Sequence, residues 1–321
     1  MRMVPRRDGF ALLATLWLVV AIGVVGLEWG HRARDQRRVA LNTVDAAAAR
    51  AAAESGIAEA FAALDEAHRR AQDPAARAAG WLRLDPWREP SRLVPDSVRT
   101  ERGTRWRIEL EDAGTRLDLN SVSVEGLRAL LIALRVDAGQ ADRVAQAVAD
   151  WRDPDDLRRA RGAERDWYVR AGRLVLPRNG PFTRVGELRH VRAVTEEVYE
   201  RAAPLLTVNG TRRVNVMAAP RPVLLALPGL GEEAVAVLER YRREGRRPPT
   251  LAAIGANLSP AARALFDANL ERLARVASIE TEEVRIRSEG FREGGPVRVV
   301  ADALVSRRGR AVRLIRLDVS P

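Results

Sequence analysis

A long apolar stretch lies near the start of the chain. From Phe10 to Leu27 no side chain is charged, and only Thr15 is polar. A stretch of this length can just span a bilayer as a helix, because a membrane-spanning helix needs about 17 to 25 residues. A secretory signal peptide and a plain membrane anchor both fit such a stretch, and a third interpretation depends on the residues that precede it. A signal peptide also requires a small-x-small cleavage site directly after it, and the sequence from Val24 to Gly26 matches that pattern only weakly.

An amphipathic helical pattern follows the apolar stretch and continues to Pro74. Its apolar residues recur at spacings of three, four and seven, which place them on one face of a helix. They are Val39, Ala46, Ala49, Ala53, Ile57, Phe61 and Leu64. Only Gly56 weakens the pattern. We therefore expect one helix from Phe10 to Asp73, about 96 Å long at about 1.5 Å per residue, and a bend between Gly26 and Gly30 is equally allowed.

Alternating polar and apolar residues predict strands in two parts of the chain. Residues 105–111 alternate with a period of two, and residues 113–116, which contain Gly114, turn this strand toward residues 117–120 in a predicted hairpin. The same alternation in residues 284–286, 297–299 and 312–317 predicts closing antiparallel strands. Before the first strand, several prolines between Pro74 and Thr104 predict a connecting loop with a short helix near Trp81.

A weak internal repeat lies between these strands. Residues 117–120 and residues 214–217 each form a short strand pattern, and leucines at the same spacing follow in a helical pattern. The second unit continues into residues 227–234, which match the hairpin of a helix-hairpin-helix module. Gly229 and Gly231 permit a tight turn whose amides could bind a phosphate. Non-specific DNA binding, supported by the arginines between positions 240 and 247, is one interpretation, and helix packing without DNA is the other.

Composition adds little that is specific. The chain of 321 residues predicts about two domains, has no cysteine, and carries a net charge of +11 with a pI near 11.2. This charge favours acidic partners such as nucleic acid or anionic lipid, but arginine and alanine enrichment also follows from a GC-rich genome. The three histidines are scattered, and no G-x-S-x-G, H-E-x-x-H or phosphate-loop motif is present. We therefore do not expect an enzyme.

Acidic residues are densest between Asp150 and Asp166. Carboxylates at alternate positions in a loop that contains a proline suit Ca²⁺, which takes six to eight oxygen ligands. The segment is not an EF-hand, because Leu157 and Arg158 stand where that loop needs a third ligand and a glycine. The alternative is a set of solvated acids that pair with the neighbouring arginines, since those cations oppose metal binding.

Four motifs resemble those of K-type minor pseudopilins of type II secretion systems. They are the basic leader Arg6-Arg7-Asp8-Gly9-Phe10, the acidic segment Asp150 to Tyr168, the segment Leu176 to Thr183 around Asn179-Gly180-Pro181-Phe182, and Val214-Asn215-Val216-Met217-Ala218-Ala219-Pro220. The resemblance spans Gly9 to about Leu227. It implies cleavage by prepilin peptidase after Gly9 and N-methylation of Phe10. Ala14 would then occupy the fifth mature position, where most pseudopilins carry a glutamate that the K type typically lacks.

The resemblance also implies a fold class and a domain order. We expect an α+β protein with a long pilin-like N-terminal helix, transmembrane in its first half, packed on a small antiparallel sheet, and a large inserted all-α domain with helix-hairpin-helix-like units. The expected segments are residues 1–9 (leader), 10–30 (membrane), 31–117 (helix and first strands), 118–275 (insertion) and 276–321 (closing strands).

The same resemblance implies a role and partners. The chain would be a tip subunit of the pseudopilus in the bacterial inner membrane, with a short cytoplasmic N-terminus and the bulk of the chain in the periplasm. It would bind the I and J minor pseudopilins and the major pseudopilin, with secreted proteins as further candidate partners, whereas nucleic acid is not expected. Calcium in the inserted domain is also implied, with Asp150, Asp153, Asp155, Glu164 and Asp166 as the expected ligands. A membrane-anchored helix-hairpin-helix DNA receptor is the alternative.

Overall fold

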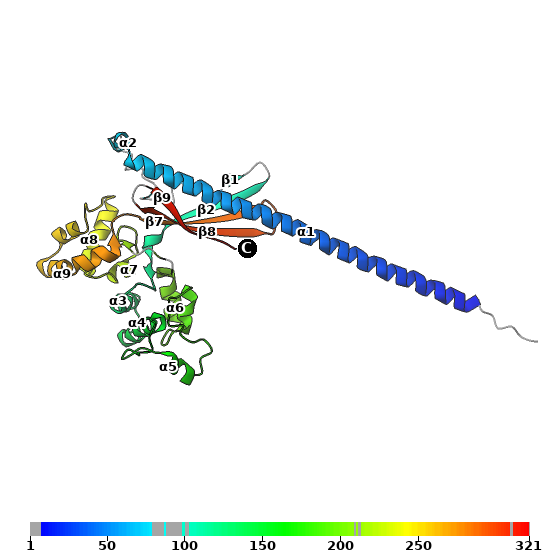
Figure 1. The fold of residues 1–321 in the computed structure, drawn as a ribbon, viewed down its shortest axis with the longest axis horizontal. Coiled ribbons are helices and arrows are strands. Elements are labelled where there is room, and N and C mark those ends of the chain that lie inside the picture. The colour runs from blue at the N-terminus through cyan, green and yellow to red at the C-terminus, as the bar shows by residue number, and fades with distance from the viewer. Residues whose placement is uncertain are drawn as a thin grey trace, which may run out of the picture.

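A long helix, an antiparallel sheet and a helical domain make up the molecule (Figure 1). The computed structural model describes residues 8–78, 87, 98–99, 103–208, 210, 213–308 and 311–320. The helix crosses one face of the sheet, and the helical domain extends from one end of it, on the side away from the free half of the helix. The expected α+β architecture is therefore confirmed.

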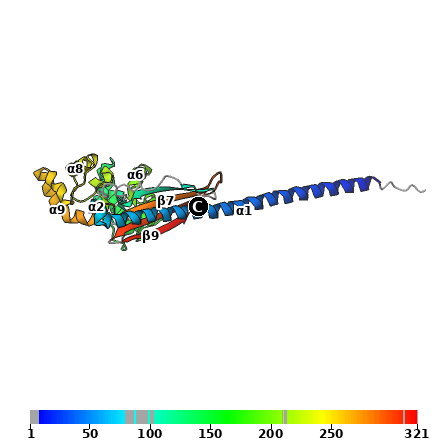
Figure 2. The same cartoon turned by 90° about the horizontal axis from the view of Figure 1, so that it is seen from above.

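The long helix α1 runs without a break from Asp8 to Gln72. The single continuous helix expected from the sequence is confirmed, and Figure 2 shows it extending far beyond the sheet. Gly9 and Phe10 lie in its first turn, whereas residues 1–7 of the expected leader lie outside the described part of the chain. Proline at position 74 cannot donate a helical hydrogen bond, so α1 ends there and a short helix, α2 (Pro74–Ala78), follows. The short helix expected near Trp81 lies outside the described residues.

The sheet has the strand order β1-β2-β7-β8-β9, and each neighbouring pair is antiparallel. Its strands are β1 (Val98–Arg99), β2 (Thr104–Asp112), β7 (Glu283–Arg292), β8 (Arg298–Arg308) and β9 (Ala311–Ser320). The closing antiparallel strands expected near the end of the chain are confirmed. β2 pairs with β7 along its whole length, from Thr104 opposite Arg292 to Asp112 opposite Val284.

The predicted hairpin between residues 105–111 and 117–120 is wrong. Residues Ala113–Thr115 form a 3-10 turn, η3, which leads the chain away from the sheet into the helical domain. Asp112 caps this turn by accepting a hydrogen bond from the backbone N of Gly114 at 2.7 Å. β3 (Leu117–Asp118) then pairs in parallel with β4 (Leu206–Thr207) and makes no pair with β2.

The apolar face of α1 is buried against the sheet of its own chain. Ala49, Ala53, Ile57 and Leu64 form one core cluster with residues of β2, β7 and β8, and each is at most 5% exposed. The backbones come close together through two glycines. A Cβ at Gly290 of β7 would lie 2.0 Å from the carbonyl oxygen of Ala49, and a Cβ at Gly56 would lie 2.2 Å from Oγ of Ser288. Gly56, which weakens the helical pattern in the sequence, is therefore required by packing.

The helical domain is inserted between β2 and β7 and has two lobes. The first lobe begins and ends with the parallel pair β3 and β4, and the second with the parallel pair β5 and β6. The first contains α3 (Val124–Ala133), α4 (Ala138–Arg152), α5 (Arg165–Arg170), η4 (Val185–His190), α6 (Glu196–Ala202) and η5 (Ala203–Leu205). The second contains β5 (Val214–Asn215), α7 (Arg221–Leu225), α8 (Glu232–Arg243), η6 (Ala252–Asn257), α9 (Pro260–Val276) and β6 (Ala277–Ser278). In both lobes a short strand, a turn and a helix follow one another, as the sequence repeat indicates.

The glycine contact between α1 and β7 yields a first prediction. Gly290→Ala should lower the free energy of unfolding by about 1–3 kcal/mol, because its new methyl group would overlap the backbone of α1 in a packed core. Gly186→Ala is the matched control: it has no atom within 4 Å of the added Cβ and should change stability by less than about 0.5 kcal/mol. Thermal denaturation of the full chain in detergent measures both, and equal melting temperatures for the two variants would contradict this packing.

Candidate metal centre

The acidic segment begins at the C-terminal end of α4. This helix starts at the N-cap Asp137, whose side chain accepts a hydrogen bond from the backbone N of Gln140 at 3.0 Å. Its apolar face, which includes Val144, Val148 and Trp151, is buried in the core of the first lobe. Since the helix is held along this face, its last turn places Asp150 inside the lobe and Asp153 at the helix end.

Asp150 is fully buried and pairs with Arg159. Nη1 of Arg159 lies 2.6 Å from Oδ1 of Asp150, and the backbone N of Arg159 donates to Oδ2 at 3.2 Å. Gly162 leaves room for this carboxylate, since a Cβ there would lie 1.9 Å from Oδ2 of Asp150. Burial raises the pKa of Asp150, and the hydrogen bonds from Arg159 oppose that rise. Asp150 is thus bound by the chain's own cation.

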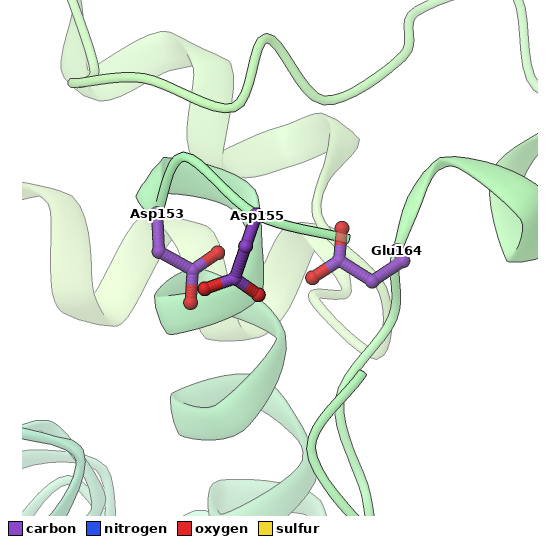
Figure 3. Close-up of side chains that lie close together, drawn as sticks. All are labelled: Asp153, Asp155 and Glu164. Carbon is purple, nitrogen blue, oxygen red and sulfur yellow. The ribbon is translucent and has the colours of Figure 1, made fainter. Parts of the chain in front are cut away.

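Three other carboxylates converge beside this pair. Asp153, Asp155 and Glu164 each contribute an oxygen, and these oxygens all lie within 4.8 Å of one another. Figure 3 shows Asp153 and Asp155 on one side of the cluster and Glu164 reaching toward them from the opposite segment. The Asp155 side chain also accepts a hydrogen bond from the backbone N of Leu157 at 2.8 Å, which fixes the turn after α4.

Glu164 is the most informative member of this cluster. It is only 4% exposed, and within the described part of the chain neither of its carboxylate oxygens has a hydrogen-bond partner. Oδ1 of Asp153 is also buried and unpartnered there. Burial, followed by the charges of Asp150, Asp153, Asp156 and Asp155, raises the pKa of Glu164 to about 7. A buried carboxylate without a partner is costly, so the cluster requires a proton or a cation.

The donor set fits a hard divalent cation. Carboxylate oxygens are the ligands that Ca²⁺ prefers, and the orphaned oxygens of Glu164 and Asp153 are available to it. Of the five residues expected as ligands, the structure brings Asp153, Asp155 and Glu164 together. It directs Asp150 to Arg159, and it places Asp166 exposed in the first turn of α5.

The sequence did not indicate the residue that holds the acidic loop in place. Asn179 has a φ of 48° and donates through Nδ2 to the backbone O of Asp155 at 3.2 Å and to Oδ1 of Asp156 at 2.8 Å. Three residues later, the Phe182 ring stacks on Trp151 with 6.2 Å between centroids. This segment therefore holds the acidic loop through Asn179 and packs against the end of α4 through Phe182.

Known proteins match this region of the chain. Residues 108–211 match the family model of type II secretion system protein K. These residues are less than half of the chain, so the match assigns this segment to the protein K family of type II secretion systems. A putative type II secretion system protein K of Escherichia coli K12 is 28% identical over 135 residues, which are 38% of this chain and 41% of that protein. A type II secretion system protein K of Dickeya chrysanthemi is 35% identical over 127 residues, 38% of this chain and 34% of that protein.

The matched part is thus less than half the length of these curated relatives. A solved structure of similar fold extends the likeness. It is a chain of the GspK-GspI-GspJ complex from the type 2 secretion system of enterotoxigenic Escherichia coli, with a TM-score of 0.64 and 19% identity. The alignment covers 90% of this chain and 99% of that one. Both lobes, the sheet and the long helix are therefore parts of a known architecture, and the acidic cluster lies inside the segment that the protein K family model matches.

The second lobe offers little to a DNA phosphate. Gly229 has a φ of 76°, but a Cβ there would lie 2.8 Å from Cβ of Asn269, so its turn packs on α9. Glu232 and Glu233 occupy the first turn of α8, where a phosphate would need positive potential. Most of the arginines expected to contact DNA have partners within the chain; they are Arg240, Arg242, Arg246 and Arg247. The DNA-binding alternative thus finds no support, and a helix-hairpin-helix module stays a prediction.

The pKa of Glu164 yields a second prediction. Because the folded chain holds this proton up to about pH 7 and the unfolded chain releases it near 4.5, the folded state binds more protons between these values. The free energy of unfolding of the metal-free protein should therefore fall as pH rises from 4.5 to 7, by up to about 3 kcal/mol. Denaturation experiments in EDTA at several pH values between 4.5 and 7 measure this fall in the free energy of unfolding.

Glu164→Gln should remove this part of the pH dependence, because the amide does not titrate. Glu200→Gln, on the exposed surface of α6, is the control and should keep the wild-type slope. A slope unchanged in Glu164→Gln would show that this carboxylate does not carry the effect.

Proposed function

We propose that the chain is a minor pseudopilin at the tip of the type II secretion pseudopilus, where it supports pseudopilus initiation and protein export across the outer membrane. The observation that carries the proposal is the helix-on-sheet domain with its helical insertion, in a chain whose residues 108–211 match the protein K family model. A rigid stalk, a sheet that holds it and a bulky domain at the far end suit a subunit that caps a filament. Proteins that the system exports are candidate ligands of this end.

The first half of α1 is proposed to anchor the chain in the bacterial inner membrane as a single pass. In the described part of the chain, α1 is the one helix long and apolar enough to cross a membrane, and its apolar window has no residue buried against the rest of the chain. Leu16, Trp17, Ile22 and Leu27 are each at least 60% exposed, which suits a lipid environment. The short N-terminal end would lie in the cytoplasm and the sheet and insertion in the periplasm.

Processing of the leader gives a third prediction. Prepilin peptidase should cut between Gly9 and Phe10 and leave N-methylated Phe10 as the first residue. Mass spectrometry of the protein extracted from membranes measures this directly. Gly9→Leu should accumulate as the full-length form, because a bulky residue replaces the one at the cleavage site. An intact Met1 in the wild-type protein, or a cut after Gly26, would contradict this assignment.

The alanine at position 14 fits the end of a filament. After the proposed cleavage Ala14 is the fifth residue, so the chain lacks the carboxylate that would pair with the amine of an adjacent subunit in the membrane. A tip subunit has no further subunit beyond it and needs no such pair. The insertion supports the same placement, because it widens the molecule at the end of α1 opposite the membrane segment (Figure 1).

The amphipathic face of α1 from Val39 to Leu64 is only partly open to the I and J minor pseudopilins. From Ala49 onward that face is buried against the chain's own sheet, so it is closed to a partner. Val39, Leu41 and Val44 are each more than 50% exposed and lie before the sheet begins to cover α1. We propose this part of α1 as the contact for the other pseudopilins.

Complex formation gives a fourth prediction. The full chain should co-purify from detergent with I-type and J-type pseudopilins in a 1:1:1 complex. Leu41→Glu should weaken the complex about tenfold or more, because it places a charge in an apolar helix contact. Ile132→Glu is the matched control, since Ile132 is 40% exposed on α3, away from α1. An unchanged affinity in Leu41→Glu would contradict the proposed contact. Labelled chain found along the whole filament would contradict the tip position.

Calcium is proposed as the ion of the acidic cluster. Asp153, Asp155 and Glu164 would hold it, and the ion would supply positive charge to Asp155 and Glu164, which form no ion pair with a described residue. Saturating Ca²⁺ should abolish the fall in stability between pH 4.5 and pH 7, since the cation replaces the proton of Glu164. A fall that persists in millimolar Ca²⁺ would argue against this ion.

We propose a structural and not a catalytic role for this site. The described residues around the cluster are other acids, arginines and a buried aromatic core, and they present no nucleophile beside the carboxylates. Binding a cation and stiffening the first lobe are what this arrangement can do chemically.

A further inference from the structure

Arg159 bridges two carboxylates at the edge of the acidic cluster. Its Nη1 atom lies 2.6 Å from Oδ1 of Asp150 and 2.5 Å from Oδ2 of Asp153. Asp150 belongs to the interior, whereas Asp153 is shared with the cluster that contains Asp155 and Glu164. One guanidinium therefore joins a structural ion pair to the candidate metal centre.

The two oxygens of Asp153 have different surroundings. Oδ2 is held by Arg159, while Oδ1 is buried and has no hydrogen-bond partner among the described residues. A divalent cation held by Asp153 would lie close to the guanidinium, and two cations at such a distance repel each other strongly where water is partly excluded. Binding a cation must therefore loosen the contact between Arg159 and Asp153.

Arg159 has an anchor that does not depend on Asp153. Its backbone N donates to Asp150, and Asp150 sits in the space that Gly162 leaves open. The side chain of Arg159 is 39% exposed, so it can turn toward solvent without opening the core. These contacts let the residue stay in place while its guanidinium is released.

We propose that Arg159 is a tethered counter-cation of the metal centre: it neutralises Asp150 and Asp153 in the metal-free chain and competes with a divalent cation for Asp153. The proposal rests on the calcium site proposed above. It assigns Arg159 as a positioning residue that lowers the affinity for the cation and keeps the loop after α4 folded in its absence. A purely structural pair would contribute to stability and leave cation affinity unchanged.

The test is calorimetric titration of CaCl₂ into the full chain in detergent, for the wild type and three variants. Arg159→Gln removes the competing charge, so its dissociation constant should fall on the order of tenfold. Arg159→Lys keeps a charge on a side chain that is one atom shorter, so it should reach Asp150 and Asp153 less well than Nη1 of Arg159 does, and its constant should fall by a smaller factor. Arg158→Gln is the control. It removes the same charge one residue earlier, where Arg158 is exposed and forms no ion pair with a described residue, so its constant should stay within about twofold of wild type.

Each outcome decides the proposal. Tighter binding in Arg159→Gln than in Arg158→Gln, together with a lower melting temperature of Arg159→Gln in EDTA, supports it. Equal calcium affinity in all four proteins would overturn the role of Arg159 and leave the calcium site standing. No calcium binding in any of them would overturn the calcium site and this role with it. If Arg159→Gln does not fold without metal, Arg159→Lys decides, and an affinity equal to or weaker than wild type would refute the competition.

Discussion

The buried carboxylate of Asp112 joins the parts of this molecule. It stands at the last position of β2, where the chain leaves the sheet, and it is only 8% exposed. Oδ1 accepts from the backbone N of Gly114, and Oδ2 accepts from Nδ2 of Asn215 and Oγ1 of Thr281, both at 2.6 Å. Asn215 opens the second lobe, and Thr281 lies just before β7, where the chain returns to the sheet. The start of the insertion, the start of its second lobe and the end of the insertion are thus all hydrogen-bonded to the carboxylate of Asp112.

This arrangement explains how a large insertion leaves the sheet regular. The ends of β2 and β7 are adjacent in the ladder, with Asp112 opposite Val284. An insertion whose two ends leave neighbouring strands at the same edge does not strain the pairing, provided that its first and last residues are fixed. Asp112 supplies that restraint through charge-assisted hydrogen bonds, which are stronger than bonds between neutral groups.

Local pattern was enough to predict much of the fold. The period of α1, the alternation of β2 and of the closing strands, and the repeat of strand, turn and helix are all properties of neighbouring residues, and the structure has each of them. The hairpin prediction was wrong because the partner of β2 is β7, a strand far away in the sequence. Asp112, for example, pairs with Val284. A turn with a glycine indicates that the chain changes direction, but it does not indicate which strand lies beside it.

The repeat has a feature that the sequence pattern does not show. At the end of α4 the Arg152 guanidinium donates to the carbonyl oxygens of Leu119 and Val122, and at the end of α8 that of Arg242 donates to those of Val216 and Ala219. In each lobe an arginine therefore satisfies the carbonyls of the turn after the first strand. Because the two lobes differ in helix length, these arginines do not align at a constant spacing, and only the structure reveals their equivalence.

The acidic cluster shows why the positions of acidic residues in a sequence do not by themselves predict which of them form a metal site. Six carboxylates lie within seventeen positions of the sequence, and burial and backbone direction separate the five that were expected as ligands. Asp150 points into the core, Asp166 lies on the surface, and Asp153, Asp155 and Glu164 face one another. Glu164 differs most, because its carboxylate is enclosed without a donor.

The cluster and the proposed partner surface lie on different structural units. Val39, Leu41 and Val44 belong to the free part of α1, whereas the cluster belongs to the first lobe, and Asp112 lies where the insertion meets the sheet. A cation that binds only the folded lobe would stabilise that lobe by mass action, but the three carboxylates proposed to hold it lie in the first lobe and not on α1. Coupling between the two would require a second arrangement of the junction at Asp112, whose three hydrogen bonds and burial favour a single one. The proposed metal centre would therefore act locally on the first lobe, while the proposed anchor and partner surface of α1 would set the place of the molecule in the membrane and in the filament.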